Sequence, residues 1–232
     1  MAVYSRISSA RTKVVTAIVL GAVLLMTLPP TRATTPSLDD QLIVVKGHTQ
    51  QTEQGVQLVR EQLALLPDLV KTKLIAYRVT IVIAPFRKEV LGTAGGACFD
   101  IKSRQVVLPE RNDLNSTFFM KQGNRRAVVL HEIGHAYDHA SGRLSFTPQY
   151  LQIYSPEERN VPANKRKLLA YFLESDMNGQ PNADSGGRPH RPPQECFASL
   201  FATKYINQDL PRLSALKACF PRTCNFVYSQ LP

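Results

Sequence analysis

Residues 128–138 read Val128-Val129-Leu130-His131-Glu132-Ile133-Gly134-His135-Ala136-Tyr137-Asp138 and contain the pattern His-Glu-x-x-His. Residues four apart lie on one face of a helix, so His131 and His135 can direct their imidazoles at one metal ion. Glu132 lies about 100° further round the helix, where its carboxylate can reach a water. Zinc lowers the pKa of such a water towards about 7, and the carboxylate can take its proton. The stretch predicts a catalytic zinc site.

The residues around this pattern are typical of a helix. Asn124 is a suitable N-cap, and Gly142 occurs where a glycine commonly follows a helix. We therefore predict a helix from Asn124 to about Ala140. The apolar side chains that would bury it in a core are Val128, Leu130, Ile133 and Tyr137.

A catalytic zinc site needs a third protein ligand, because two histidines and a water leave one tetrahedral position unfilled. The longer pattern His-Glu-x-x-His-x-x-Gly-x-x-His does not apply, since Asp138 and Ser141 occupy its glycine and last histidine positions. His139 comes two residues too early, and we expect it to support the site or to lie on the surface. The third ligand must come from further along the chain.

Three downstream glutamates are weaker candidates for this ligand. Glu157 and Glu158 fall in a proline-rich stretch, 143–161, that we predict to be irregular. Glu174 lies on a predicted helix over 164–177 and remains an alternative ligand.

Glu195 is the favoured third ligand. It lies near the start of a helix predicted over 193–207. One face of this helix is bulky and would be core. The face that carries Glu195 has small neighbours that allow a close approach to the histidine helix, namely Ala198, Ser199 and Ala202.

The chain before the histidines predicts a helix followed by strands. Residues 52–66 have the apolar spacing of an amphipathic helix, and residues 77–83 alternate and are β-branched, as in a strand. Cys98–Asp100 and Gln105–Leu108 flank a polar turn and predict a hairpin. We predict an α+β fold of the zincin type, with a small mixed sheet and the active-site helix in an upper lobe and a mainly helical lower lobe.

An edge strand beside the metal site would offer backbone groups to an extended peptide. The segment Gly95–Asp100 is our candidate for this edge, with an ordinary hairpin edge as the alternative. Its predicted substrate-binding residues are Gly95, Gly96, Ala97 and Cys98.

The segments His131–Asp138 and Glu195–Phe201 together resemble the catalytic domain of anthrax lethal factor and its smaller secreted relatives, including the Pro-Pro endopeptidases. These are gluzincin-type zinc metallopeptidases. The resemblance covers roughly residues 75–207 and is strong only at the two helices. It implies that Glu195 is the third zinc ligand and that Glu132 is the general base.

The sequence departs from that family at two positions. Ser199 stands where the family has a second glutamate. Arg188 stands where the family has a tyrosine that stabilises the oxyanion. We therefore name Arg188 and His190 as catalytic candidates for this role, and Tyr171 is a third that the fold could bring to the site. Asp138, three residues beyond His135, is predicted to accept a hydrogen bond from a ligand imidazole.

The N-terminus has the features of a secretory signal peptide. Basic residues precede an apolar run, Val14–Leu28, and a small residue, Ala33, follows it. We predict cleavage after Ala33, leaving residues 34–232 as one metallopeptidase domain, with an uncleaved anchor as the alternative. Removal of 1–33 takes away four basic residues and no acidic ones, so the net charge falls from +10 to +6. The charge alone assigns no partner.

All four cysteines lie in the predicted mature chain. An even number in an exported protein suggests two disulfide bonds. Proximity in sequence favours Cys219 with Cys224, which leaves Cys98 with Cys196.

The sequence thus predicts a secreted, monomeric endopeptidase that binds one zinc ion and acts on a peptide or protein. We expect no nucleic-acid partner and no stable membrane association after signal cleavage. The alternative is a non-catalytic zinc-stabilised protein that docks extended peptides or a cell-surface partner. Retention of Glu132 argues against it, because a purely structural zinc has no use for a base.

Overall fold

A four-stranded mixed sheet occupies the first half of the chain. The computed structural model describes residues 36–232 except 48, 113–122, 175–190 and 207. The strand order is β1-β2-β4-β3, with β1, β2 and β4 parallel and β3 antiparallel at the edge. The predicted α+β class and small mixed sheet are confirmed. The strands are β1 (Ile43–Val45), β2 (Thr80–Phe86), β3 (Cys98–Asp100) and β4 (Gln105–Arg111).

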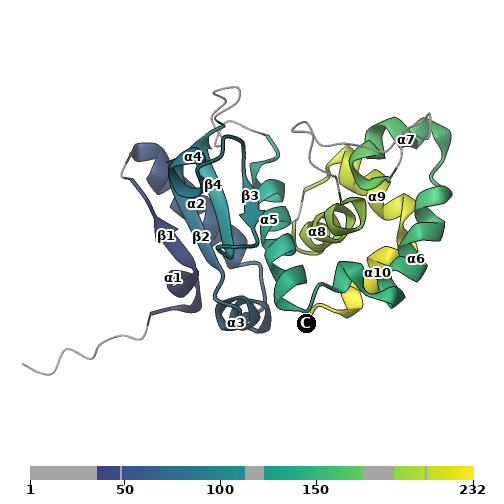
Figure 1. Ribbon diagram of the computed structural model, residues 1–232, viewed down its shortest axis with the longest axis horizontal. Helices are drawn as coiled ribbons and strands as arrows, with labels where there is room; N and C mark the ends of the chain where they lie inside the picture. The colour runs from purple at the N-terminus through teal and green to yellow at the C-terminus, as the bar shows by residue number, and fades with distance from the viewer. Residues whose placement is uncertain (1–35, 48, 113–122, 175–190, 207) are drawn as a thin grey trace, which may run out of the picture. The chain divides into compact units, whose positions relative to one another are not determined.

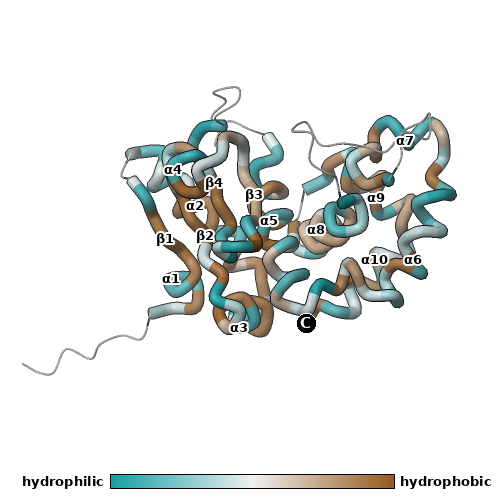
Figure 2. The backbone as a smooth tube through the Cα atoms, viewed as in Figure 1, coloured by the Kyte–Doolittle hydropathy of each residue, from teal (hydrophilic) through white to brown (hydrophobic). Residues whose placement is uncertain are grey.

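The central strands are apolar along most of their length. Four consecutive residues of β2 and five of β4 are buried, as expected for parallel strands that are covered on both faces. Figure 2 shows hydrophobic colour concentrated on these strands. The sheet therefore forms one side of the core.

Helices make up most of the remaining described chain. Figure 1 shows α5 between the sheet and the later helices, and α5 contacts β3 and β4 on one side and α8 on the other. The α-helices are α1 (Leu38–Leu42), α2 (Gln50–Leu63), α3 (Asp68–Ala76), α4 (Lys88–Leu91), α5 (Arg125–Ala140), α6 (Pro148–Arg159), α7 (Ala163–Leu169), α8 (Pro192–Tyr205), α9 (Pro211–Cys219) and α10 (Pro221–Ser229), and short 3-10 turns are η2 (Leu144–Phe146) and η3 (Ala170–Phe172).

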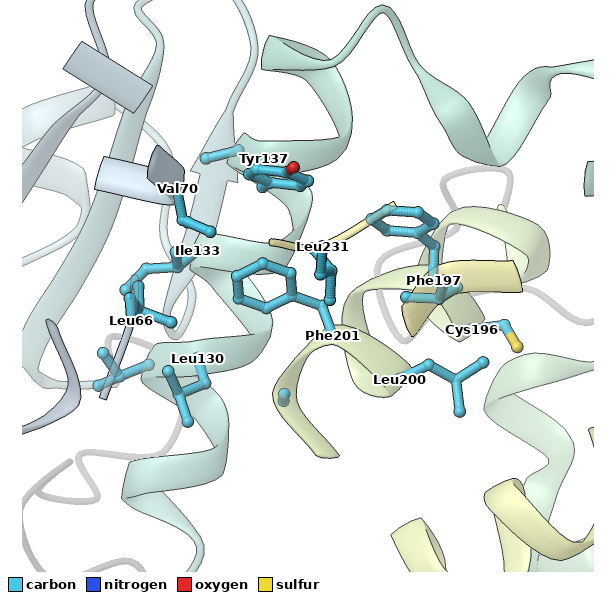
Figure 3. Packing of buried hydrophobic residues seen from close by; sticks show 14 of the residues in the cluster. Leu66, Val70, Leu130, Ile133, Tyr137, Cys196, Phe197, Leu200, Phe201 and Leu231 are labelled. Carbon is cyan, nitrogen blue, oxygen red and sulfur yellow. The ribbon is translucent and has the colours of Figure 1, made fainter. Parts of the chain in front are cut away.

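The tightest helix pair is α5 with α8. A Cβ atom on Gly134 would lie 2.9 Å from both the Cα and the carbonyl oxygen of Ala198, closer than side chains tolerate. Glycine at this position is therefore required for the observed approach. Figure 3 shows Phe201 of α8 turned toward Leu130 and Ile133 of α5. The small face predicted for the Glu195 helix meets α5 at Ala198, and the bulky Phe201 also packs against α5.

The stretch predicted to be irregular, 143–161, mostly forms the helix α6. Pro148 occupies its first turn, where a missing N–H costs nothing, and the Thr147 hydroxyl accepts a hydrogen bond from the Tyr150 N–H. Tyr150 and Tyr154 are fully buried with stacked rings. Of the prolines that suggested a loop, Pro148 starts this helix and Pro156 lies within it, and burial of two tyrosines stabilises it.

Other boundaries also differ from the predictions. The predicted strand 77–83 begins at Thr80, because Tyr77 caps α3 and Arg78 adopts a left-handed conformation with φ 62°. The helix predicted over 164–177 ends its regular part at Phe172, in η3. Helices α9 and α10 were not predicted, and each begins with a proline.

All four cysteines are free thiols, so the predicted disulfide bonds are wrong in this structure. Cys98 lies on β3 near Glu132, whereas Cys196 is fully buried on α8 against Tyr150 of α6. Cys219 ends α9 and Cys224 lies within α10. Proximity in sequence did not identify bonded pairs, because the members of each predicted pair lie on different helices or strands.

The predicted signal peptide, 1–33, lies outside the described residues. Within the described part of the chain, we find no helix with the length and apolar character needed to cross a membrane.

Candidate metal centre

Three side chains converge between α5 and α8. The Nε2 atoms of His131 and His135 lie 3.1 Å apart, and Glu195 Oε2 lies 3.1 Å from the first and 3.2 Å from the second. All three residues offer donor atoms within 4.8 Å of one another. The structure thus brings the two predicted histidines and the favoured glutamate to one point that could hold a metal ion.

Local contacts set the position of Glu195. It lies in the first turn of α8, and the buried Tyr150 hydroxyl donates to the Pro193 carbonyl oxygen at 2.9 Å. The neighbouring Gln194 amide donates to Nε2 of His139 at 3.0 Å. His139 is buried and ties the start of α8 to the end of α5, so it supports the site without facing the metal position.

Ser199 is the direct partner of a histidine in the site. Its Oγ lies 2.9 Å from Nδ1 of His131. If Nε2 is left free for a metal, Nδ1 carries the hydrogen and donates a hydrogen bond to Ser199 Oγ. Such a contact fixes the tautomer and the ring orientation of a ligand histidine. The sequence placed Ser199 on the small face beside Glu195 and marked it as a departure from the family, but it did not predict this contact with His131.

Asp138 does not make the predicted hydrogen bond to a ligand imidazole. Its two carboxylate oxygens accept hydrogen bonds from the Ser145 backbone N–H at 2.8 Å and from the Ser145 hydroxyl at 2.6 Å. Nδ1 of His135 is buried, and no described residue is its hydrogen-bond partner. Asp138 lies near the end of α5, and its carboxylate orders the turn that follows the helix instead.

Electrostatics favour an ionised carboxylate at the centre. Burial alone would raise the pKa of Glu195, but the imidazoles of His135 and His131 outweigh it and lower that pKa far below its usual value. Burial alone would lower the pKa of His135, and the Glu195 carboxylate outweighs it and raises that pKa. The site therefore holds an anionic oxygen donor against two nitrogen donors.

The alternative glutamates serve other purposes. Glu157 accepts hydrogen bonds from the backbone N–H groups of Arg222 and Thr223, at 2.8 and 3.0 Å, and so caps α10. Glu158 is buried and lies 3.7 Å from Arg166. Glu174 is exposed and does not belong to the three-residue cluster.

Tyr171 is the oxyanion candidate that the fold brings to the site. Its ring centroid lies 6.5 Å from that of His131. Tyr171 is 39% exposed, but the loss of water on the side that faces the site, reinforced by the negative charges of Glu195 and Glu132, raises the pKa of Tyr171 above its usual value, so it remains a proton donor. The Tyr154 hydroxyl donates to the Phe172 carbonyl oxygen at 2.6 Å and anchors this segment. The candidates Arg188 and His190 lie outside the described residues.

The predicted substrate edge is partly engaged by a side chain. Cys98 begins β3, and burial raises the pKa of its thiol to about 11, with a further contribution from Glu132. Gly95, Gly96 and Ala97 precede the strand in a loop. The Arg87 guanidinium donates to the Gly96 carbonyl oxygen at 3.4 Å. The part of this edge that could pair with a peptide is therefore limited to the short strand β3.

A pocket of about 390 Å³ adjoins the metal centre and includes His131 and Glu132 in its wall. A group in this pocket would lie next to both a predicted metal ligand and the predicted base. Its apolar lining comes from α5, η3, α8 and α9 and includes Ala127, Val128, Phe172, Ala202, Leu210 and Leu213.

The chain is similar to the solved structure of the Pro-Pro endopeptidase PPEP-2 from Paenibacillus alvei, with a TM-score of 0.51 and 18% sequence identity over 84% of this chain and 100% of that one. At this identity the likeness concerns the fold, and it agrees with the resemblance to Pro-Pro endopeptidases. Comparison with models of protein families gave no match, and comparison with curated proteins gave none either.

Proposed function

We propose that this protein is an exported, monomeric zinc-dependent endopeptidase, formed by residues 34–232 after removal of a signal peptide. The observation that carries the proposal is the convergence of His131, His135 and Glu195 on one point, with Glu132 beside it and a pocket alongside. A peptidase needs these parts together: a cation site, a base and a place for substrate.

The donors present suit zinc. Two imidazole nitrogens and one carboxylate oxygen form a common ligand set of catalytic zinc sites, which keep a fourth position open. The three donor atoms lie about 3 Å from one another. A cation bound to all three would balance the repulsion between their lone pairs. Zinc bound there would polarise the scissile carbonyl and acidify a water.

The residues of the chain would divide the remaining work. Glu132, on the side of α5 that faces the pocket, accepts the proton of the attacking water and then gives it to the leaving amine. The neutral Tyr171 hydroxyl donates a hydrogen bond to the carbonyl oxygen as that oxygen gains negative charge. The exposed edge of β3 pairs with the extended peptide.

The first experiment is cleavage of a proteome-derived peptide library by the purified protein, with Glu132→Gln as the matched inactive variant. We expect cuts that disappear in the variant and after chelation, and one zinc per chain in both proteins. A folded protein that holds one zinc but cuts nothing would favour a non-catalytic, zinc-stabilised binding protein. A folded protein without zinc would contradict the metal assignment.

Export is tested separately. We expect the protein in the culture medium to begin at Thr34 when its N-terminus is sequenced. A product that retains residues 1–33 in the membrane fraction would contradict signal cleavage.

A further inference from the structure

The wall of the pocket beside the metal centre includes a positively charged side chain. Arg212, in the first turn of α9, is the one arginine or lysine among the described residues that line it. Its guanidinium carbon lies 4.9 Å from the ring centroid of Tyr171 and 4.7 Å from that of Phe172. Two aromatic faces therefore hold the guanidinium beside the reacting groups.

Arg212 has no carboxylate partner in the described part of the chain. Other arginines there form ion pairs, as Arg60 does with Asp40 at 2.8 Å, but none of the ion pairs includes Arg212. Arg212 is exposed overall, but packing against the two rings removes part of the water around its guanidinium and lowers the pKa of Arg212, an effect that Tyr171 and the Glu195 carboxylate oppose. An arginine that stacks on two rings in a pocket wall and binds no carboxylate keeps its N–H donors available to an incoming anion.

The charge balance of the pocket points the same way. With a divalent metal bound, the carboxylates of Glu195 and Glu132 offset its two positive charges. Arg212 then leaves one positive charge without a balancing group among the described lining residues. The rest of the lining is largely apolar, so a ligand would bring an aliphatic stem together with an anionic end.

We propose that Arg212 is a specificity-determining residue and that the pocket selects peptides with a carboxylate next to the scissile bond. This inference rests on the proposed peptidase function. The carboxylate can come from an acidic side chain or from the C-terminus of a short peptide, and both would present the same two oxygens to the guanidinium fork. The preference is expected to be about tenfold over the neutral amide, because hydrogen bonds between two charged groups are stronger than those to a neutral amide.

The test compares matched substrates. Four versions of one cleaved peptide carry glutamate or glutamine beside the scissile bond, each with a free or an amidated C-terminus. We expect the wild-type kcat/KM to fall about tenfold when the relevant carboxylate becomes an amide. Comparison of glutamate with glutamine tests the side-chain carboxylate, and comparison of the free with the amidated C-terminus tests the terminal carboxylate. Equal kcat/KM values for all four peptides would overturn the inference.

Variants of Arg212 distinguish recognition of a substrate carboxylate from stacking of the guanidinium on Tyr171. Arg212→Gln is expected to remove the carboxylate preference, whereas Arg212→Lys retains most of it. The ratio of acid to amide substrates is the readout, since loss of stacking on Tyr171 would slow all substrates alike. Arg222→Gln makes the same change in net charge on exposed α10 and should leave the ratio unchanged. An unchanged ratio in Arg212→Gln would also overturn the inference.

Failure of the proposed function would be visible independently. If no peptide is cut by the wild type, the same four peptides are titrated onto the zinc-loaded Glu132→Gln protein by calorimetry. A tenfold affinity preference for the carboxylate that disappears in the double variant with Arg212→Gln would support the pocket assignment without catalysis. Equal affinities for acid and amide would reject it.

Discussion

Gly134 of α5 lies directly against the backbone of Ala198 of α8, and a Cβ on Gly134 would come within 2.9 Å of it. This contact sets the separation of the two helices that carry the histidines and Glu195. The metal centre therefore depends on a residue that bears no side chain and touches no metal.

Gly134→Ala adds one methyl group, yet we expect it to destabilise the fold and to weaken zinc binding. The added methyl must push α8 away from α5, which we expect to lower the free energy of unfolding by about 1–3 kcal/mol and to weaken zinc binding. Thermal unfolding and zinc titration measure both effects. Gly123→Ala is the matched control, since a Cβ there meets nothing within 4 Å. Wild-type zinc affinity in Gly134→Ala would show that the helix spacing does not control the site.

Ser199→Ala should loosen His131 without unfolding the protein. Loss of the acceptor at 2.9 Å from Nδ1 leaves the imidazole free to change orientation or tautomer. We expect zinc affinity to fall by about 10- to 100-fold, as is typical for the loss of a partner of a ligand histidine. Competition with a chromogenic chelator measures this. Ser214→Ala, whose hydroxyl contacts Asp209 away from the centre, should have no effect.

Tyr171→Phe should reduce turnover while leaving the metal in place. The hydroxyl is proposed to stabilise charge that develops only in the transition state, so kcat should fall by about 100-fold or more with little change in KM. Steady-state kinetics and zinc content test this. Tyr205→Phe is a suitable control, because no described residue is a hydrogen-bond partner of the Tyr205 hydroxyl. An equal loss in both variants would point to packing.

His139 predicts a loss of stability in acid. Burial, with further contributions from Arg143, His135 and Arg191, lowers its pKa to about 4 from an ordinary 6.5. The unfolded chain therefore binds the proton first, and stability falls as pH decreases from about 6.5 to about 4 and then levels off. This shift corresponds to about 3 kcal/mol.

Urea unfolding of the metal-free protein from pH 7 to pH 4 measures that loss. His139→Gln cannot titrate and should show a shallower decrease over this range, while the other acidic groups titrate equally in both proteins. Parallel curves would mean that His139 contributes no pH dependence.

The local features of this protein followed from the sequence. Spacing of four residues placed His131 and His135 on one face of a helix that forms where predicted, because helical geometry depends only on neighbours along the chain. The hairpin and the helix of Glu195 were predicted for the same reason. Small residues beside Glu195 also indicated which face would approach α5, since packing distance is limited by side-chain size.

Tertiary structure alone decided what surrounds those residues. Ser199 reaches His131, Asp138 turns to Ser145, and Tyr171 and Arg212 arrive from η3 and α9, which lie far from α5 in sequence. The cysteines likewise form no disulfide bond although their spacing suggested pairs. Such contacts depend on how separate elements pack, and no spacing within one segment encodes the distance between two of them.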